Sequence, residues 1–473
     1  MNAMLKSGID GLDEALDGGF NSPSTVLIAG TAGTGKTTLA LQILFNAVRN
    51  GETCLFVAGV SEPIMCLNRH LSAFSFFDPD LEGVHFLDVG DLLLMRDDVM
   101  RVLTEEIESI KPDRVVIDSF LDIAGKSFMY DLVSYMKKSN TMLFITDTFT
   151  REKIDRHYIA SLVDGIMYLS SDDGHRYVSV LKMRGQNIST KRHSFKFTGA
   201  GIEVFPRIKP EAITAVSNRK ISLGVGGIDQ MMNGGVFEGD STLVAGGPGT
   251  GKTLLGLQFI HEGAVHGEKG LIISFEESPP EILRNVRHFG VDFESMGDMV
   301  KIIHPYTADM IPDEHTLLIK RELNDVKRVV VDGFSDYISV LPDPIELKKW
   351  FRTLISLFKS EGVTSLFTSE IRSLHGPFEI TDHGLSFVVD NVILMKHVEM
   401  ESEMRTAMYI IKMKGSQHDK EIRRFRITSK GIEVETKFEG REGLLSGIST
   451  ETAERRFVRT LSKQSKKEMR RNG

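Results

Sequence analysis

A glycine-rich motif occurs twice in this chain of 473 residues, and this duplication constrains the fold more than any other feature. Residues 30–37 are GTAGTGKT and residues 246–253 are GGPGTGKT, an offset of 216 positions. The same offset relates further identical residues between positions 11 and 63, without a gap. Because the repeat unit is far longer than the 20–50 residues of solenoid repeats, we interpret it as a duplicated domain.

Later segments of the two copies also match, at slightly different offsets. Arg114-Val-Val-Ile-Asp118 corresponds to Arg328-Val-Val-Val-Asp332, and the tetrapeptides at 182–185 and 412–415 are KMRG and KMKG. The second copy therefore has 16 additional residues between Asp332 and Lys412. We expect three regions with a linker near 206–218: an N-terminal domain over 1–212, a C-terminal domain over 213–440, and a basic mobile tail over 441–473.

The hydrophobic pattern predicts the same elements in each copy. In the first copy, short apolar runs indicate strands at 25–29, 54–57, 114–117 and 142–145, and four-residue spacing of apolar side chains indicates a helix at 36–50. Alternating strands and helices favour an α/β fold with a mostly parallel sheet covered on both faces. Period-two alternation at 177–181 and 194–197 predicts an antiparallel edge hairpin.

Both glycine-rich motifs fit G-x-x-x-x-G-K-[ST], the pattern of a loop that binds nucleotide phosphates. Glycines let successive backbone N–H groups point at the phosphates, and the lysine reaches the β- and γ-phosphates. A glycine-rich turn without function is a poor explanation for two matches at one offset, each between a predicted strand and a predicted helix. The predicted ATP-binding residues are Gly33, Thr34, Gly35, Lys36, Thr37 and Thr38, and Gly249, Thr250, Gly251, Lys252, Thr253 and Leu254.

A predicted magnesium site accompanies each loop. Asp118 and Asp332 each end a run of branched apolar residues, which places a carboxylate at the edge of the sheet beside the loop. Thr37 and Thr253 follow the loop lysines, at the position whose hydroxyl binds Mg²⁺ in such loops. A strand-end aspartate that only caps a turn is the alternative, and the pairing with a loop in both copies argues against it.

The two copies diverge after their second predicted strand. The second copy has Glu276 and Glu277, whereas the first has Val60 and Ser61 at the same offset and Glu62 one place later. Hydrolysis at a γ-phosphate needs an acceptor that orients the attacking water. We therefore expect the second copy to hydrolyse ATP and the first mainly to hold it, unless a one-residue bulge brings Glu62 into place. A charged loop edge is the alternative for the two glutamates.

A pair of basic residues follows in each copy. Lys182 and Arg184, and Lys412 and Lys414, are expected on a strand whose period of two places both members of a pair on one face. In ring-shaped ATPases such a pair reaches the neighbour's γ-phosphate, whereas the alternative is a solvated strand face. Lysine cannot reproduce the planar fork of arginine. The predicted catalytic residues are Glu276, Glu277, Lys252, Lys412 and Lys414, and Lys182 and Arg184 are expected to contact the nucleotide.

Charge is distributed unevenly along the chain. Residues 454–473 contain eight Lys or Arg and two Asp or Glu, whereas the whole chain has 57 basic and 65 acidic residues. An acidic body attracts nucleic acid poorly, although a basic tail can bind it or dock a partner. The two cysteines, the absence of an apolar N-terminal segment and the absence of a long apolar run favour a cytoplasmic protein without a membrane span.

These motifs together resemble the KaiC family, RecA-superfamily ATPases with two fused lobes. The resemblance rests on the tandem loops, on Phe-Glu-Glu-Ser at 275–278, on Lys-Met-Lys-Gly-Ser-Gln-His-Asp at 412–419, and on Gly8-Ile-Asp-Gly-Leu-Asp13 before Gly18-Gly19. It covers about residues 5–440 and implies two tandem RecA-like P-loop domains that bind ATP and Mg²⁺.

The resemblance also implies an assembly and a modification. It implies a double-ring homohexamer with ATP at subunit interfaces, across which the basic pairs act, and a regulator that binds the C-terminal tail. KaiC phosphorylates an adjacent Ser-Thr pair in its second lobe; here Ser386 matches the serine, but Phe387 replaces the threonine. Single-site autophosphorylation at Ser386 or Thr381 is therefore the expectation, in place of a two-site cycle.

Two other functional classes use the same loops. A RecA-like DNA-dependent ATPase that assists recombination or repair should show DNA-stimulated turnover and salt-sensitive binding. A nucleotide-gated scaffold should show little turnover. The acidic body argues against the first class and the basic tail modestly for it, so an ATPase assay with and without single-stranded DNA separates the readings.

Overall fold

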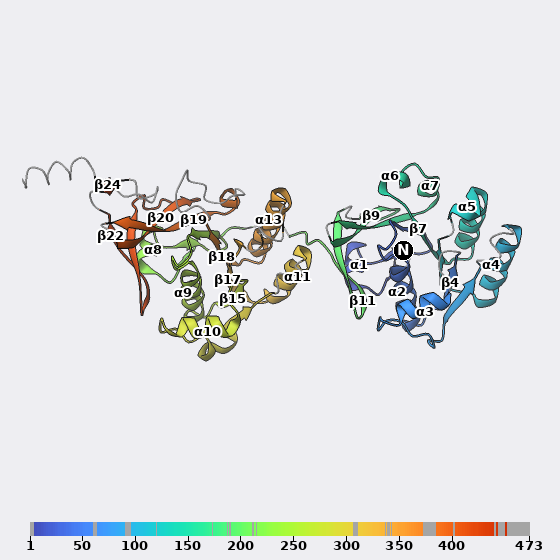
Figure 1. The fold of residues 1–473 in the computed structure, drawn as a ribbon, viewed down its shortest axis with the longest axis horizontal. Coiled ribbons are helices and arrows are strands. Elements are labelled where there is room, and N and C mark those ends of the chain that lie inside the picture. Colours follow the sequence, from blue (N-terminus) through green and yellow to red (C-terminus); the bar gives the residue numbers. More distant parts are fainter. Residues whose placement is uncertain are drawn as a thin grey trace, which may run out of the picture. The chain divides into compact units, whose positions relative to one another are not determined.

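The computed structural model divides the chain into two compact units, Met1–Ile208 and Lys209–Gly473, which we call the first and second lobes (Figure 1). The structure describes residues 4–59, 64–89, 96–119, 121–172, 174–186, 188, 191–210, 212–213, 215–305, 311–335, 337, 341, 343–371, 385–400, 403–438, 441–442 and 450–451.

The first lobe is built on a nine-stranded sheet. Its strands are β3 (Thr25–Gly30), β4 (Cys54–Ala58), β5 (Val84–Asp88), β6 (Arg114–Asp118), β7 (Met142–Thr148), β8 (Gly165–Asp172), β9 (His175–Met183), β10 (Arg192–Thr198) and β11 (Gly201–Phe205). The order across the sheet is β11-β10-β9-β8-β3-β7-β6-β4-β5. Neighbours from β8 to β5 are parallel and those from β8 to β11 are antiparallel. The predicted parallel sheet with an antiparallel edge is confirmed.

The second lobe repeats this sheet strand for strand. Its strands are β14 (Ser241–Gly246), β15 (Lys269–Ser274), β16 (Val300–Ile303), β17 (Val326–Asp332), β18 (Thr364–Glu370), β19 (Asn391–Met400), β20 (Glu403–Met413), β21 (Arg423–Thr428) and β22 (Gly431–Lys437). The order β22-β21-β20-β19-β14-β18-β17-β15-β16 corresponds position by position to that of the first lobe. The α/β class and the duplication are therefore both confirmed.

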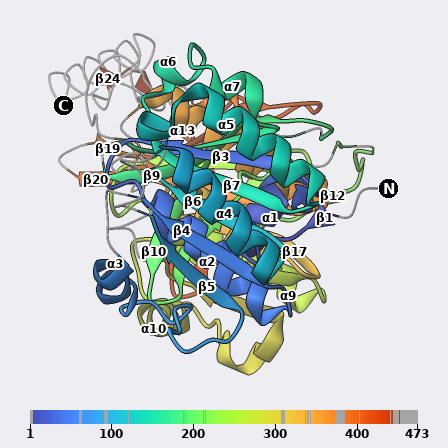
Figure 2. The same cartoon turned by 90° about the vertical axis from the view of Figure 1, so that its right-hand side faces the viewer.

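Helices cover both faces of each sheet because the central strands bury alternate side chains on opposite sides. In the first lobe, Val26 and Ile28 pack with α2 (Lys36–Arg49), and Leu27 and Ala29 belong to the core on the other face. The helices of that lobe are α1 (Asp10–Ala15), α2, α3 (Ile64–Leu71), α4 (Arg96–Ile110), α5 (Leu121–Lys138), α6 (Arg151–Ile154) and α7 (Ile159–Leu162). Figure 2 looks onto α4 and α5, which cover one face of the sheet.

The helices of the second lobe follow the same plan. They are α8 (Gly226–Met231), α9 (Lys252–Val265), α10 (Pro279–Arg287), α11 (Pro312–Glu322) and α13 (Pro344–Ser360), with the short 3-10 helices η2 (Glu294–Met299) and η3 (Leu385–Phe387). Val244 packs on the face of α9, and Leu243 and Ala245 pack on the face of α13. Trp350 on α13 is 3% exposed and lies in that second core, stacked near Tyr337 and Phe334.

Short ribbons flank the sheets: β1 (Met4–Leu5) with β2 (Phe20–Asn21), β12 (Lys220–Ile221) with β13 (Val236–Phe237), and β23 (Arg441–Glu442) with β24 (Thr450–Glu451). None of the helices in the described part of the chain has the length and apolar character that crossing a bilayer requires.

The 16 additional residues of the second lobe are not one insertion. β3 and β14 end at equivalent glycines, so the residues that pair with these glycines mark equivalent positions in the two lobes. By this comparison, eight of the additional residues lie between β17 and β18, and four lie between β18 and β19. The remaining four lengthen the hairpin of β19 and β20 relative to that of β8 and β9. The central strands are matched in register, so both lobes present the same sheet edge to their loops.

Candidate active site

Each glycine-rich motif forms the loop between the central strand and the helix that follows it. In the first lobe the loop joins β3 to α2, and in the second it joins β14 to α9. Gly35 and Gly251 occupy the N-cap positions with φ of 96° and 91°. A Cβ at either position would come within 2.6 Å of Phe197 or 2.9 Å of Ile427, respectively. Glycine is therefore required both by the left-handed backbone and by the closely packed edge strand.

Threonines brace both loops from inside. The hydroxyl of Thr34 donates to the carbonyl of Thr31 at 2.8 Å, and that of Thr250 donates to Gly247 at 2.9 Å. Both side chains are buried. The outer glycines Gly33 and Gly249 have positive φ and no side chain to block a ligand.

The loop lysines lie over their own loops. The ammonium of Lys36 donates to Thr31 O at 3.0 Å, and that of Lys252 donates to Gly247 O at 2.9 Å. Burial lowers the pKa of each lysine, and nearby carboxylates oppose that shift, with Glu370 the foremost of them in the second lobe. The ammonium groups are thus held against the loops, at the position from which such a lysine reaches bound phosphates.

The proposed metal ligands meet in both lobes. The Thr37 hydroxyl lies 3.2 Å from both carboxylate oxygens of Asp118, and the Thr253 hydroxyl lies 3.1 Å from both oxygens of Asp332. Both aspartates are buried, and burial raises the pKa of Asp332. Mg²⁺ prefers oxygen ligands and takes few of them from the protein, so this hydroxyl–carboxylate pair fits the ion. Among the described residues, no group of three or more His, Cys, Asp or Glu side chains forms a fuller metal cage.

A further threonine holds each of these aspartates, and the sequence analysis missed it. Thr146 on β7 and Thr368 on β18 each donate a hydroxyl hydrogen bond to the aspartate of the adjacent strand, at 2.6 Å in the second lobe. Both threonines lie on the strand next to that of the aspartate, and the sequence alone does not show which strands are neighbours. Each carboxylate is thereby fixed from two sides.

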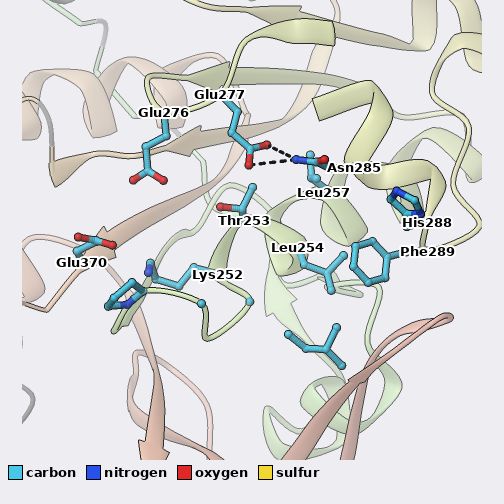
Figure 3. Close-up of a pocket in the computed structure, with 14 residues that line it drawn as sticks. Lys252, Thr253, Leu254, Leu257, Glu276, Glu277, Asn285, His288, Phe289 and Glu370 are labelled. Atoms are coloured by element: carbon cyan, nitrogen blue, oxygen red, sulfur yellow. Dashed lines mark hydrogen bonds between the residues drawn. The ribbon is translucent and has the colours of Figure 1, made fainter. Parts of the chain in front are cut away.

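A cavity of about 670 Å³ opens beside the loop of the second lobe. Figure 3 shows Lys252, Glu276 and Glu370 at one end, and Leu254, Leu257 and Phe289 at the other. The full lining is Pro248, Gly249, Gly251, Lys252, Thr253, Leu254, Leu257, Glu276, Glu277, Asn285, His288, Phe289, Glu370 and Ile427. A charged end beside a phosphate-binding loop and an apolar end with an aromatic ring suit a nucleotide. In the first lobe Thr38, at the position of Leu254, directly follows the metal-site threonine.

The two neighbouring glutamates of the second lobe have different surroundings. The carboxylate of Glu277 accepts from the Asn285 side chain on α10 at 3.2 and 3.3 Å. Glu276 lies on the side of Lys252 and Glu370 (Figure 3) and contributes to the electrostatic field at Lys252. Glu276 is therefore the better placed of the two to act on a ligand held by the loop.

Glu370 is a second residue that the sequence analysis missed. It is the last residue of β18 and pairs with Gly246, where the loop begins. The corresponding partner of Gly30 in the first lobe is Thr148. No local motif marks Glu370, because only the parallel pairing of β18 with β14 brings it to the loop.

Several predicted residues lie outside the described residues. These are Val60, Ser61 and Glu62, which carry the predicted difference between the lobes, and Thr381, one of the two candidate phosphorylation sites. Most of the basic tail lies outside them as well.

The basic pairs are anchored within their own lobe, and one expectation about them is wrong by one residue. Lys182 and Lys412 lie next to the last residues of β9 and β20, which are methionines, and Arg184 and Lys414 lie in the turns just after them. The outer basic residue of each pair is therefore not on the strand. Both members of a pair nevertheless contact the same segment, the one before the neighbouring strand.

Backbone carbonyls and one aspartate per lobe receive these cations. Lys182 donates to the carbonyls of Ala160 and Val163, both at 2.7 Å, and Arg184 contacts Asp164 at 3.2 Å. In the second lobe, Lys412 donates to the carbonyls of Ser386 at 3.0 Å and Val389 at 2.7 Å, and Lys414 contacts Asp390 at 3.1 Å. Ser386 itself is half-buried in η3.

Comparison with known protein families decides the wider relationship. The KaiC ATPase family model matches residues 5–209 and again residues 221–439. The chain belongs to the KaiC family of ATPases. It is thus an ATPase of a family with tandem nucleotide-binding domains, and the predicted resemblance is confirmed.

Curated relatives match over nearly the whole chain. The circadian clock oscillator protein KaiC of Prochlorococcus marinus is 30% identical, covering 98% of this chain and 99% of that protein. The circadian clock oscillator proteins KaiC of Nostoc sp. and Synechococcus elongatus are 28% and 29% identical, and each match covers 92% of the relative. The KaiC relationship therefore extends through both lobes.

Proposed function

We propose that the second lobe is the main site of ATP hydrolysis and that the first lobe chiefly holds ATP. The cavity that brings Lys252 and Glu276 together beside the loop supports this assignment. Lys252 would bind the β- and γ-phosphates, and Glu276 would accept a proton from the attacking water and orient it. Leu254, Leu257 and Phe289 would enclose the base.

Magnesium would be held by Thr253 and Asp332 in the second lobe, and by Thr37 and Asp118 in the first. The bound ion would neutralise charge on the β- and γ-phosphate oxygens. The chain itself fixes the aspartate ligand of each lobe, through the hydroxyls of Thr368 and Thr146 on the neighbouring strand. The loop residues Gly33, Thr34, Gly35, Lys36, Thr37 and Thr38 would bind the nucleotide of the first lobe, as Gly249, Thr250, Gly251, Lys252, Thr253 and Leu254 would that of the second.

The experiment that tests this assignment is the substitution Glu276→Gln in the full chain. Glutamine keeps the size of the side chain but cannot accept the proton, so ATP turnover should fall by about 100-fold or more. Nucleotide affinity, measured by equilibrium binding of ATP, should stay within about threefold, because Lys252 and the loop are unchanged.

The matched control is Glu277→Gln. Since Glu277 is hydrogen-bonded to Asn285, its loss should reduce turnover less than that of Glu276. Unchanged turnover in Glu276→Gln would remove Glu276 as the base. A large loss in Glu62→Gln would move the hydrolytic site to the first lobe.

We further propose a homohexameric ring with two layers, in which domains spanning 1–212 and 213–440 each bind ATP at a subunit interface. In this arrangement Lys182 and Arg184, and Lys412 and Lys414, would contact the nucleotide of a neighbouring subunit. Neither Lys412 nor Lys414 belongs to the lining of the second-lobe cavity. Sedimentation of the chain with and without Mg-ATP tests the ring, because a persistent monomer would contradict it.

We also propose that the second lobe phosphorylates itself, with Ser386 as the acceptor and Thr381 as the alternative. Support comes from the hydrogen bond of Lys412 to the Ser386 carbonyl, which links the acceptor segment to a residue of the interface pair. Mass spectrometry after incubation with Mg-ATP tests this proposal. An unmodified peptide over residues 372–396 would reject it.

The basic tail over 441–473 is the proposed docking element for a protein regulator in the cytoplasm, since it carries a local positive charge beside an acidic body. Affinity capture with the full chain and with a chain ending at residue 453 would test it. Stimulation of turnover by single-stranded DNA would instead favour a nucleic-acid partner.

A further inference from the structure

An aspartate lies beside the first residue of the central strand in each lobe, and it is buried in the second lobe and half-buried in the first. Asp164 directly precedes β8, and Asp390 directly precedes β19. The backbone N–H of the first residue of the neighbouring central strand, Thr25 or Ser241, donates to the carboxylate at 3.0 Å. The hydroxyl of Ser241 adds a second bond to Asp390 at 2.9 Å. Each carboxylate is therefore fixed to the strand that leads into the phosphate-binding loop.

Each aspartate also pairs with a lysine of the helix that covers that face. Lys137 at the end of α5 lies 3.0 Å from Asp164, and Lys359 near the end of α13 lies 2.6 Å from Asp390. Burial disfavours the ionised form of Asp390, but hydrogen bonds from Lys359 and Ser241 outweigh it and lower its pKa to about 2. The carboxylate is thus a permanent negative charge with fixed orientation at physiological pH.

The outer member of each basic pair is the third partner. Arg184 and Lys414 contact the aspartate through the side chain, and their backbone N–H groups donate to the aspartate carbonyl at 2.9 and 3.2 Å. Both cationic side chains are 53% exposed, whereas the carboxylate of Asp390 is 7% exposed. Arg184 also donates to the Ser161 carbonyl at 3.0 Å, so in both lobes a largely exposed cation is tethered to an aspartate that is itself shielded from solvent.

This arrangement lies at the opposite end of the central strand from the nucleotide loop. β14 begins at Ser241, next to Asp390, and ends at Gly246, where the loop starts. A strand rises about 3.4 Å per residue, so the two ends lie roughly 17 Å apart. Lys414 held at Asp390 is therefore beyond reach of the loop of its own lobe, and it is displayed for a ligand bound elsewhere.

The constellation occurs in both lobes although the residues around it differ. The central-strand N–H, the helix lysine, the aspartate and the outer cation are all repeated, while arginine in one lobe is replaced by lysine in the other. A long, flexible cationic side chain loses conformational entropy when it is immobilised. If an anion already immobilises the cationic side chain, less conformational entropy is lost when that side chain contacts a nucleotide.

We propose that Asp164 and Asp390 are positioning residues that preset Arg184 and Lys414 to contact the nucleotide of a neighbouring subunit. This inference rests on the proposed role of the basic pairs across subunit interfaces. The aspartates do not touch the nucleotide; they act through the cation. Loss of the charge should therefore lower turnover without weakening ATP binding to the loops.

The test is a double-mutant cycle in the full chain with Asp390→Asn and Lys414→Ala. Each single substitution should lower ATP turnover, Lys414→Ala by about 100-fold and Asp390→Asn by about tenfold, with ATP affinity unchanged. In the double variant, Asp390→Asn should add no further loss, because its effect requires Lys414. A merely structural role would instead give additive losses.

The matched control is Asp240→Asn, at the residue before Ser241. Asp240 accepts a hydrogen bond from Asn391 and interacts with Lys414 through its charge alone, with no hydrogen bond or ion pair between the two side chains in the described part of the chain, so turnover should fall by no more than about twofold. Should Asp390→Asn fail to fold, Ser241→Ala removes only one hydrogen bond to Asp390 and should give a smaller loss in the same non-additive pattern.

The outcomes separate this inference from the function on which it rests. If Lys414→Ala leaves turnover unchanged, the interface role of Lys414 fails and the inference fails with it. If Lys414→Ala lowers turnover but Asp390→Asn raises it or leaves it unchanged, the interface role stands and the positioning role is overturned. The positioning role is also overturned if the losses of ATP turnover from the two single substitutions add in the double variant.

Discussion

The two lobes share one scaffold and differ in the carboxylates near the loop lysine. Strand order, loop geometry and the threonine–aspartate pair are the same in both. The second lobe has Glu276 and Glu370 near Lys252, whereas the first has Thr148 in place of Glu370 and Asp147 as the further carboxylate acting on Lys36. The loop and its threonine–aspartate pair are thus repeated, while the acidic residues around the lysine have changed.

The sequences also differ after the second strand. At the offset of 216 the first copy has Val60 and Ser61 where the second has Glu276 and Glu277, and its Glu62 comes one place later. Glu276 lies on the side of Lys252 in the second lobe.

The antiparallel strands near the loops differ as well. In the first lobe the Arg176 guanidinium packs 4.8 Å from the Phe197 ring and donates to the Gly33 carbonyl at 3.0 Å. The residues in the same strand register in the second lobe are Thr406 and Ile427. An arginine tied to the loop suits a lobe that retains nucleotide, and the smaller residues suit one that exchanges it.

The largest effect that tests the difference between the lobes is expected from substitution of each loop lysine. Lys252→Ala should abolish ATP binding in the second lobe and reduce total turnover by about 1,000-fold, since the lysine contacts the β- and γ-phosphates. Lys36→Ala should remove one bound ATP per chain but leave most of the turnover. Equilibrium binding and steady-state ATPase assays measure both. Equal losses of turnover in the two variants would show that the lobes share hydrolysis.

A smaller effect is expected on acid stability. The Asp390 carboxyl has a pKa of about 2 in the folded lobe against an ordinary value of 3.8. Its depressed pKa stabilises the folded lobe by about 2 kcal/mol above pH 4, and this contribution disappears as the pH falls through 2. Asp390→Asn should therefore lower the unfolding free energy at pH 7 and have progressively less effect below pH 4.

Trp350 makes that measurement specific to the second lobe, because it is the only tryptophan and is buried in the second core. Its emission during urea unfolding should shift to lower denaturant in Asp390→Asn at pH 7. Asp164→Asn should leave the Trp350 transition in place. A pH-independent difference between wild type and Asp390→Asn would contradict the assignment.

The smallest effect is expected from exchanging the outer cation. Lys414→Arg gives the second lobe the residue type of Arg184, with a planar fork that can keep its contact to Asp390 and still present further N–H groups. We expect ATP turnover to rise about threefold, measured at saturating Mg-ATP. A fall in turnover would indicate that lysine is matched to the second lobe.

Local patterns predicted the elements well where the chain itself specifies them. Gly35 and Gly251 mark the loops because no other residue suits their backbone, and the apolar runs before Asp118 and Asp332 predict buried parallel strands. Prediction failed where partners come from distant segments. Arg184 and Lys414 were expected on a strand, but the strands end one residue earlier, where the chain turns to pair with the aspartate.

The sequence by itself determined the duplicated α/β architecture, the two phosphate-binding loops and the family, because these depend on local spacing and on repetition within one chain. Only the tertiary structure decided that Thr368 holds Asp332, that Glu370 joins the site, and that Asp390 receives Lys414. Parallel strands bring together residues separated by long crossover segments. Their register, and hence these contacts, is set by packing of both sheet faces and cannot be derived from any one segment.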